Sequence, residues 1–234
     1  MKRLEGKVAI VTGGSKGIGR GIGEALAREG AHVILAARDQ EVIREVTVGM
    51  RAAGLHVRGL QADVSKEADV ERLVDDVIRT EGGLDILVNN AGWGVFKPVI
   101  DMTVAEFDGM WATNMRGVFL MSKAAVPHMR KAGGGDIVHI ASLAGKNAMK
   151  NGAGYCATKW ALRGFAGSMM LEVREYNIRT ITICPGSVET GFSQSGKKGA
   201  NIPQPADVAA AVVFAVTAEG RAMFSEIDLR PTMP

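Results

Sequence analysis

The stretch KVAIVTGGSKGIG, residues 7–19, decides the fold of this chain. Residues 7–12 form a short apolar run of the kind that predicts a buried strand. A glycine-rich turn follows, and residues 17–29 then show the periodicity of a helix. In a strand–turn–helix unit, such glycines let the backbone approach a pyrophosphate, which the helix N-terminus attracts. The stretch therefore predicts a dinucleotide site at the first turn of a parallel sheet.

The same alternation of strand and helix continues along the chain. Seven apolar runs have the length of a strand, at residues 7–12, 32–37, 56–61, 86–89, 136–141, 179–184 and 225–229. Helical periodicity fills the gaps, at residues 17–29, 40–53, 66–80, 104–131, 154–176 and 205–218. Most strands are nearly continuous in Val, Ile, Leu and Ala, which is typical of strands covered on both faces. The pattern predicts the α/β class: one Rossmann-type domain over residues 1–234, with a doubly wound seven-stranded parallel sheet and helices on both faces.

The composition argues against several classes of protein. The 234 residues are 47% hydrophobic and include 28 basic and 25 acidic side chains, for a net charge of +3. No basic stripe favours nucleic-acid binding, and no apolar run approaches the roughly 20 residues that span a membrane. The N-terminus enters a strand without the features of a signal peptide, so we expect a cytoplasmic protein. The two cysteines, Cys156 and Cys184, lie in apolar elements, and we expect reduced packing residues with no disulfide and no metal site.

The end of the second predicted strand bears on the choice of cofactor. A site that selects NAD places a carboxylate there, roughly 20 residues beyond the glycine turn, for the ribose 2′-hydroxyl. This chain has Ala36, Ala37 and Arg38 instead. Arg38 and Lys16 could pair with a 2′-phosphate, although either cation alone is commonly just solvated and Asp39 could neutralise Arg38. The pattern favours NADP(H) over NAD(H).

A tyrosine and a lysine are spaced by one helical turn within the predicted helix 154–176. Tyr155 and Lys159 are four residues apart, so the phenol and the ammonium project from the same face. A nearby cation favours the phenolate and moves a phenol pKa of about 10 toward working pH. By itself, such a pair usually marks a solvated face. Ser142, a short interval upstream, and the glycine turn favour an acid–base site.

Together these motifs resemble the short-chain dehydrogenase/reductase family in its single-domain form, over essentially the whole chain. The matching motifs are TGGSKGIG at residues 12–19, Asp63-Val64, Asn89-Asn90-Ala91-Gly92, Asn114, Ser142, Tyr155 with Lys159, and Pro185-Gly186 with Thr190. Each motif alone could be accidental, but their joint order and spacing make coincidence very improbable. Within the family, the overall sequence pattern most resembles that of 3-oxoacyl-carrier-protein reductases and related small NADPH carbonyl reductases.

The resemblance implies a role for each matching residue. The implied catalytic set is Asn114, Ser142, Tyr155 and Lys159. The implied cofactor contacts are Gly13, Ser15, Lys16, Gly17, Ile18, Gly19, Arg38, Asp63, Val64, Asn90, Ala91, Gly92, Tyr155, Lys159, Pro185, Gly186, Val188 and Thr190. Within that set, Asp63 would bond the adenine amino group, Val64 would pack against the ring, and Thr190 would contact the nicotinamide amide. Asn114 would hold a water that extends the proton path from Lys159.

The implied reaction is the reversible reduction of a ketone to a secondary alcohol. In the family, NADPH supplies the hydride, Ser142 would bond the carbonyl oxygen and Tyr155 would donate the proton, helped by Lys159.

Residues 187–204 lose periodicity directly after a strand end, so we expect a substrate loop there, with a plain surface loop as the alternative. The expected pocket walls are mostly apolar: Trp93, Val95, Phe96, Leu143, Ala144, Met149, Val188 and Phe192.

The C-terminal segment departs from the carrier-protein reductases. Their Gly-rich tail is replaced by EIDLRPTMP, residues 226–234, which is similar to the ending of short reductases that act on small hydroxy acids and diverse ketones. Lys197 and Lys198 could meet an acidic carrier protein or a carboxylate, although a lysine pair in a loop is usually only solvated. A 3-oxoacyl thioester and a ketone or small hydroxy acid without a carrier both stay open as substrates.

The same residues bear on two other activities and on the assembly state. An epimerase or dehydratase of the extended branch would normally carry a longer C-terminal substrate domain, and a nucleotide-sensing regulator would usually lack a catalytic residue that this chain retains. We expect the predicted helix 154–176 to expose apolar side chains, namely Trp160, Phe165, Met169 and Met170. Such a surface favours a homodimer or homotetramer, with internal packing as the alternative.

Overall fold

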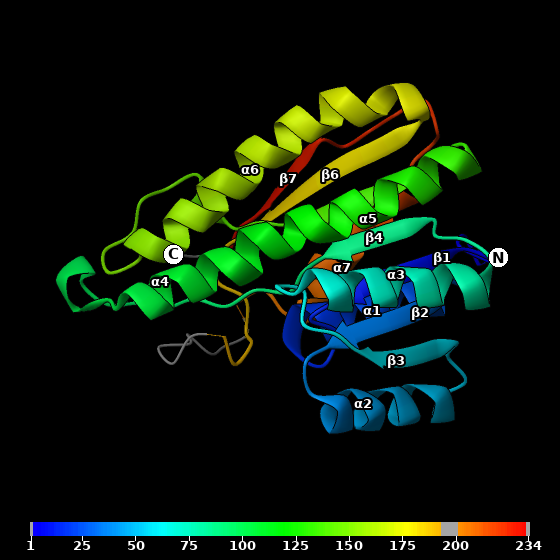
Figure 1. Ribbon diagram of the computed structural model, residues 1–234, viewed down its shortest axis with the longest axis horizontal. Coiled ribbons are helices and arrows are strands. Elements are labelled where there is room, and N and C mark those ends of the chain that lie inside the picture. Colours follow the sequence, from blue (N-terminus) through cyan, green and yellow to red (C-terminus); the bar gives the residue numbers. More distant parts are fainter. Residues whose placement is uncertain (1, 193–200, 233–234) are drawn as a thin grey trace.

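The fold is built around one parallel sheet with helices on both faces. A computed structural model describes residues 2–192 and 201–232 (Figure 1). The strands are β1 (Val8–Thr12), β2 (His32–Ala37), β3 (Val57–Gln61), β4 (Ile86–Asn89), β5 (Gly135–Ile140), β6 (Ile178–Pro185) and β7 (Glu226–Leu229). The longer helices are α1 (Gly17–Arg28), α2 (Gln40–Ala52), α3 (Glu67–Glu81), α4 (Val104–Trp111), α5 (Gly117–Ala132), α6 (Ala153–Val173) and α7 (Pro205–Val216). Short helical segments are η1 (Val99–Asp101), η2 (Ala112–Arg116), η3 (Leu143–Gly145) and η4 (Arg174–Tyr176).

The strand order places a ligand crevice next to β1. All neighbouring strands are parallel, in the order β3-β2-β1-β4-β5-β6-β7. The chain builds outward from β1 to β3 and then returns to form β4 on the other side of β1. In open parallel sheets, ligands bind beyond the carboxyl ends of the strands where the order reverses. The glycine turn follows β1 and the asparagine turn follows β4, so both turns border this crevice.

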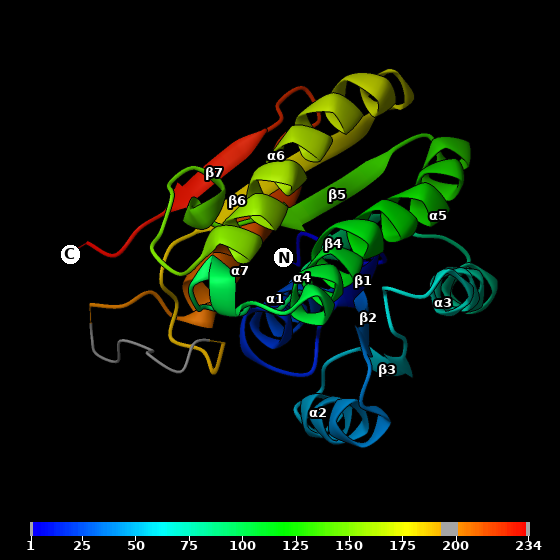
Figure 2. The same cartoon turned by 60° about the vertical axis from the view of Figure 1, so that its left-hand side comes forward.

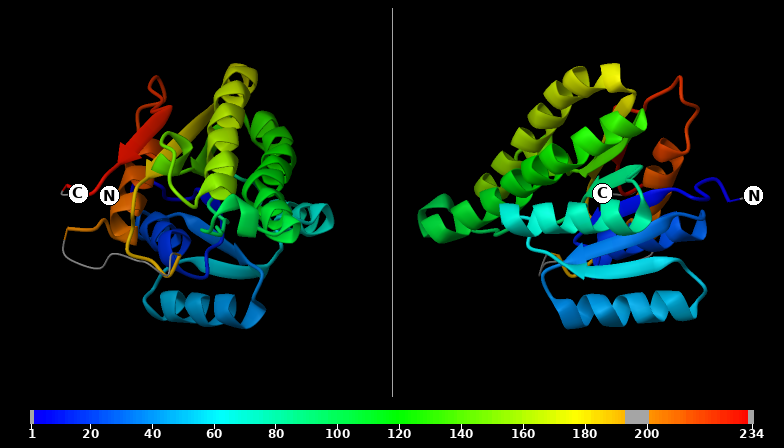
Figure 3. Two further views of the ribbon diagram at one scale, coloured as in Figure 1. Left: turned by 90° about the vertical axis from the view of Figure 1, so that its left-hand side faces the viewer. Right: turned by 45° about the vertical axis from the view of Figure 1, so that its right-hand side comes forward.

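Apolar side chains on the two faces of the sheet form two cores. Helices α1, α2 and α7 cover one face, with Leu26 and Val212 fully buried there. Helices α3, α5 and α6 cover the other face and bury Val74, Met129 and Met169. Figures 2 and 3 show the helices flanking the sheet on both sides. All five residues of β1 are buried, which explains its unbroken apolar sequence. The predicted doubly wound seven-stranded sheet is confirmed.

The predicted single helix over residues 104–131 is corrected by the structure. A π-helical turn, η2, separates α4 from α5 within this segment. Such a turn closes its hydrogen bonds one residue later than an α-helix and is frequent at functional sites. Asn114 lies in the turn and is buried. The break in helical geometry therefore coincides with a predicted catalytic residue.

The exposed face of α6 differs from the prediction. Trp160 is 52% exposed, as predicted, but Met169 is only 5% exposed because it lies on the side of α6 that packs on the sheet. Phe165 also packs against the core. Leu171, which was not expected, is exposed instead. The homodimer or homotetramer stays a prediction.

Both cysteines match their predicted surroundings. Cys156 and Cys184 are free and buried. Across residues 2–192 and 201–232, no helix combines the length and the apolar character that crossing a membrane requires.

A buried histidine on β5 makes the fold sensitive to acid. His139 is fully buried, and its Nδ1 lies 3.3 Å from the amide nitrogen of Asn89. Burial, followed by the charge of Lys159, lowers the pKa of His139 from 6.5 to about 3. The unfolded chain gains a proton near its ordinary pKa whereas the folded chain does not, so stability falls as the pH drops from about 6.5 toward 3. We expect this residue to remove about 2 kcal/mol of stability between about pH 7 and pH 5.

His139→Gln tests this expectation, because glutamine can keep a polar contact with Asn89 but does not titrate. Urea unfolding at the two pH values should show a loss of stability that is smaller in the variant than in the wild type by about 2 kcal/mol. His128→Gln, on α5, is the matched control and should lose as much stability as the wild type. Equal losses in wild type and His139→Gln would rule out this source of acid sensitivity.

Candidate active site

The glycine turn after β1 is packed so closely against the turn after β4 that side chains do not fit there. Gly13 has a φ of +66°, and an added Cβ would lie 2.9 Å from the Cα of Ala91. On Gly19, an added Cβ would lie 2.3 Å from the carbonyl oxygen of Gly13 and 2.4 Å from Nδ2 of Asn90. Bare backbone at the start of α1 is the surface that a dinucleotide pyrophosphate requires. The turn therefore fits such a group.

Hydrogen bonds join the two turns. Oγ1 of Thr12 accepts from the backbone amides of Asn90 and Ala91, both at 3.0 Å. Nδ2 of Asn90 donates to the carbonyl oxygen of Thr12 at 2.8 Å. The side chain of Asn89 is buried and reaches Ser122 at 3.3 Å. The asparagine run therefore braces the carboxyl ends of β1 and β4.

Two cations near the glycine turn have free side chains. Lys16 precedes α1 and Arg38 follows β2, and both are exposed. Within the part of the chain that the structure describes, neither side chain forms an ion pair or a hydrogen bond. Asp39 does not neutralise Arg38 but caps α2, where its carboxylate accepts from the amide of Val42 at 3.0 Å. Two unpaired cations beside the uncharged Ala37 fit a 2′-phosphate.

Further predicted cofactor residues follow β3 and β6. The carboxylate of Asp63 is oriented by the amide and the hydroxyl of Ser65, at 3.0 and 2.7 Å. Val64 is buried in the core below α5. Thr190 lies next to the glycine turn, with its Cγ2 3.4 Å from the position of a Cβ added to Gly17. The cofactor contacts of these residues stay predictions.

The predicted substrate loop, residues 187–204, is only partly described. Residues 193–200, with Lys197 and Lys198, lie outside the described part of the chain. The two flanks contact each other: the amide of Glu189 donates to the carbonyl oxygen of Pro203 at 2.8 Å, and Nε2 of Gln204 donates to Glu189 at 2.9 Å. The role of this segment as a substrate loop stays a prediction.

Three predicted catalytic residues meet at the carboxyl ends of β5 and β6. Tyr155 and Lys159 are buried in the first turns of α6. Ser142 follows β5, and its hydroxyl donates to the carbonyl oxygen of Pro185 at 3.3 Å and accepts from the amide of Ala144 at 3.1 Å. The Ser142 side chain also lowers the pKa of Tyr155. The arrangement provides an acid and a hydrogen-bonding partner side by side.

Burial, and not the neighbouring cation, is the largest cause of the shift in the pKa of Tyr155. It raises the pKa of Tyr155 to about 12, against the smaller lowering by Ser142. Burial also lowers the pKa of Lys159 to about 8. Nζ of Lys159 donates to the carbonyl oxygen of Ile140 at 2.8 Å and lies 5.8 Å from the centre of the Tyr155 ring. The expected lowering of the phenol pKa by Lys159 is not among the causes of this shift, and Tyr155 is protonated at neutral pH.

Asn114 is held by the backbone of Trp93. Its Oδ1 accepts from the amide of Trp93 at 3.0 Å, and its Nδ2 donates to the carbonyl oxygen of Trp93 at 2.9 Å and to Oγ1 of Thr158 at 3.1 Å. Gly92 packs close to the same side chain, because a Cβ added to Gly92 would lie 3.2 Å from Oδ1 of Asn114. Both side-chain N–H groups are used, so a water on the predicted proton path would bind through an oxygen of Asn114.

Aromatic rings enclose the phenol. The ring centres of Phe96 and Phe192 lie 5.3 and 5.6 Å from that of Tyr155 and 6.3 Å from each other. Trp93, also predicted as a pocket wall, turns its indole toward α4, where Nε1 donates to the carbonyl oxygen of Gly109 at 3.1 Å. The two phenylalanines therefore form the apolar wall beside the phenol.

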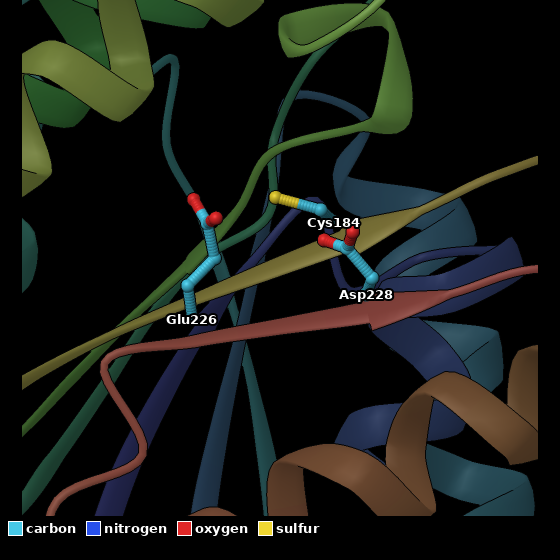
Figure 4. A group of neighbouring side chains, drawn as sticks. All are labelled: Cys184, Glu226 and Asp228. Atoms are coloured by element: carbon cyan, nitrogen blue, oxygen red, sulfur yellow. The ribbon is translucent and has the colours of Figure 1, made fainter.

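A sulfur and two carboxylates also converge where β6 pairs with β7. The side chains of Cys184, Glu226 and Asp228 point to the same face of the sheet, with their ligand atoms within 4.8 Å of one another (Figure 4). Such a set could hold a metal ion. Here, however, Nζ of Lys146 lies 2.5 Å from an oxygen of Glu226 and 2.5 Å from an oxygen of Asp228. In this structure the group is an ion-pair cluster.

The chain matches known proteins over most of its length. The family model for short chain dehydrogenases matches residues 7–201. Dehydrogenase/reductase SDR family member 4 from Oryctolagus cuniculus is 39% identical over 193 residues, 82% of this chain and 74% of that protein. Sepiapterin reductase from Chlorobaculum tepidum is 34% identical over 234 residues, 96% of each chain. A metagenomic short-chain oxidoreductase solved in complex with NADP has a TM-score of 0.88 at 36% identity, over 99% of this chain and 100% of that one.

The matched range includes the residues predicted to be catalytic. It contains the glycine turn, Ser142, Tyr155 and Lys159. The similarity to oxidoreductases, which extends along nearly complete chains for two of these proteins, supports an enzyme that acts on CH–OH groups. The chain belongs to the short-chain dehydrogenase/reductase family.

Proposed function

We propose that the protein is an NADP(H)-dependent oxidoreductase that reversibly reduces a ketone to a secondary alcohol. The observation that carries the proposal is the meeting of Ser142, Tyr155 and Lys159 at the crevice bordered by the glycine turn. Lys16 and Arg38, which lack an anionic partner among the described residues, support the phosphorylated cofactor. The NADP in the related metagenomic structure supports the same choice.

The protein side chains divide the acid–base work. When bound, the nicotinamide supplies the hydride to the carbonyl carbon. The hydroxyl of Ser142 turns from the Pro185 carbonyl to the substrate oxygen and orients it. Tyr155, kept protonated by burial, donates its proton to that oxygen. Lys159, one turn further along α6, stabilises the phenolate that remains.

For the substrate, we propose a free ketone with an apolar flank. Phe96 and Phe192 line the side of Tyr155 with apolar rings, which suits an alkyl or aryl group next to the carbonyl. The relative from Chlorobaculum tepidum is named as a reductase of sepiapterin, a free small molecule. Lys197 and Lys198, which could meet a carrier protein, lie outside the described residues. A 3-oxoacyl thioester is the alternative substrate.

Steady-state kinetics with both cofactors test the function. NADPH oxidation is measured with alkyl and aryl ketones, β-keto esters and an acetoacetyl thioester. We expect turnover of a free ketone, with kcat/KM at least about tenfold higher for NADPH than for NADH because charge-assisted bonds to a phosphate are worth about 1.5–3 kcal/mol. A preference for NADH would contradict the cofactor assignment. Binding of NADPH without turnover of any carbonyl would favour a nucleotide-sensing regulator.

Arg38→Ala supplies the matching variant for that experiment. The loss of a charge-assisted bond to the 2′-phosphate should lower kcat/KM for NADPH about tenfold to a hundredfold and leave that for NADH nearly unchanged. Arg44→Ala is the control, since Arg44 lies on α2 and pairs with Glu41 at 2.9 Å. An Arg38→Ala enzyme that uses NADPH as well as the wild type would remove Arg38 from the cofactor site.

A further inference from the structure

We propose that Lys146, Arg163, Glu226 and Asp228 form an ion-pair cluster that positions Ser142 by fastening η3 to the last strand, β7. The inference rests on the proposed function, because it assigns a purpose to the placement of Ser142. It also gives a role to the EIDLRPTMP ending, which the cofactor site and the acid–base residues leave unexplained. None of the four side chains is part of the reacting set, so they are positioning residues.

Ser142 depends on η3 for its place. The segment is a single 3-10 turn that begins directly after the serine, and Ser142 caps it through the amide of Ala144 at 3.1 Å. The next amides all have partners within the turn: Gly145 donates to the carbonyl of Ser142, and Lys146 and Asn147 donate to that of Leu143, each at 2.9 Å. One turn has few internal bonds, so its anchoring to the rest of the protein determines where the serine hydroxyl lies.

The far end of η3 is anchored to α6. Nη1 of Arg163 donates to the carbonyl oxygen of Gly145 at 2.8 Å. Gly145 also lies so close to α6 that an added Cβ would be 2.6 Å from the carbonyl oxygen of Lys159. The turn that carries Ser142 is therefore pressed against the helix that carries Tyr155 and Lys159.

Two carboxylates of β7 complete the cluster. Glu226 and Asp228 are two residues apart on a strand, so they share one face of the sheet (Figure 4). Lys146, directly after η3, contacts both carboxylates at 2.5 Å, and Nε of Arg163 donates to Glu226 at 2.8 Å. Between 22% and 33% of each of these four side chains is exposed. Water and salt therefore screen their charges less than they screen fully exposed ion pairs.

The side chains of the cluster are held in their charged forms at neutral pH. Burial lowers the pKa of Lys146, but Asp228 and Glu226 outweigh it and hold that pKa above its ordinary value, so the ammonium persists at neutral pH. Burial, followed by the charge of Glu226, raises the pKa of the neighbouring Cys184 to about 11 and keeps the thiol neutral. Lys146 and Arg163 therefore face the two carboxylates, and Arg230 lies 3.6 Å from Asp228 as a third cation. Removal of Lys146 would leave Asp228 facing Glu226 across the space that the ammonium now fills.

The backbone of β7 contacts the other side of the same site. The amide of Gly186, after β6, donates to the carbonyl oxygen of Leu229 at 2.8 Å. An added Cβ on Gly186 would lie 3.1 Å from Leu143 and 3.4 Å from Pro231. Strand β7 is a four-residue edge strand with one neighbour, so its own ladder fixes it weakly. The cluster thus holds β7 and η3 against each other at the catalytic serine.

Lys146→Met and Lys146→Arg test the inference, with Lys123→Met as the matched control. Methionine removes the ammonium, whereas arginine can restore both ion pairs. Lys123 lies on α5, and its ammonium pairs with Glu67 of α3 at 2.9 Å, so this ion pair does not involve η3. For ketone reduction, we expect Lys146→Met to lower kcat about tenfold, because small misplacements of reacting groups are costly, with KM for NADPH changed less than about twofold. Lys146→Arg and Lys123→Met should stay within about twofold of the wild type.

Hydrogen exchange of the peptide that spans residues 143–147 provides a readout without turnover. Its amides should exchange faster in Lys146→Met than in the wild type, and Lys146→Arg should restore protection. The inference is overturned if folded Lys146→Met keeps wild-type kcat and protection, or if Lys146→Arg is as impaired as Lys146→Met. If the wild type reduces no ketone, the proposed function fails, but the exchange pattern still decides whether the cluster fastens η3.

Discussion

Replacing Tyr155 by phenylalanine is expected to remove ketone reduction while leaving NADPH binding nearly intact. Only the hydroxyl is lost, and the ring keeps its neighbours Phe96 and Phe192 at 5.3 and 5.6 Å between ring centres. A positioned general acid contributes roughly 10²- to 10⁴-fold, so kcat should fall by about that factor. Turnover and the Kd for NADPH, measured on the same preparation, separate loss of chemistry from loss of binding.

Tyr176→Phe is the control for this substitution. Tyr155 and Tyr176 are the two tyrosines of the chain. Tyr176 lies in η4, beyond the opposite end of α6 from Tyr155, and the guanidinium of Arg130 lies 4.2 Å from the centre of the Tyr176 ring. The Tyr176→Phe variant should retain wild-type kcat. A Tyr155→Phe enzyme with more than about a tenth of wild-type kcat would show that another group donates the proton.

The second large effect is expected from Gly19→Ala. A Cβ at this position would lie 2.3 Å from the carbonyl oxygen of Gly13 and 2.4 Å from Nδ2 of Asn90. Either the backbone at Gly13 or the side chain of Asn90 therefore has to move. Overpacking of this kind typically costs about 1–3 kcal/mol, and here the displaced atoms belong to the proposed binding site of the pyrophosphate. We expect the Kd for NADPH to rise about tenfold to a hundredfold, as measured by fluorescence titration, together with a lower Tm.

Gly49→Ala is the matched control for the glycine substitution. Gly49 lies inside α2, and an added Cβ would meet no atom within 4 Å. The variant should gain about 0.4–1 kcal/mol of stability, since alanine restricts the unfolded chain, and should bind NADPH like the wild type. Unchanged NADPH binding in Gly19→Ala would mean that the cofactor does not rest on this turn.

The strands and the site motifs were predictable because their signals are local. Every residue of β1 is buried, so its sequence is continuously apolar. The glycine turn is recognisable from its place between this apolar run and a helical periodicity, although the close contacts of Gly13 are made with Asn90 and Ala91. The one-turn spacing of Tyr155 and Lys159 likewise follows from helix geometry alone. These features need no knowledge of distant parts of the chain.

Other features depend on partners far away in the sequence and could not be predicted. The π turn at Asn114 has no periodic signature, because it shifts the helix by a single residue. The pKa of Tyr155 is set mainly by burial, and spacing says nothing of burial. Thr12 joins two turns through its hydroxyl, yet in the sequence it is one more strand residue. Thr158, which bonds Asn114, did leave a signal, since it follows Tyr155 by three residues and therefore lies near the same face of α6.

The position of β7 in the sequence also bears on how the enzyme is made. A chain leaves the ribosome from its N-terminus, so the glycine turn, Ser142 and Tyr155 emerge before Glu226 and Asp228 have been translated. If the cluster fastens η3 as proposed, a nascent chain can already hold all its acid–base residues while its serine is not yet in place. Full activity then begins only once translation has passed the last strand, which ties catalytic competence to completion of the sheet.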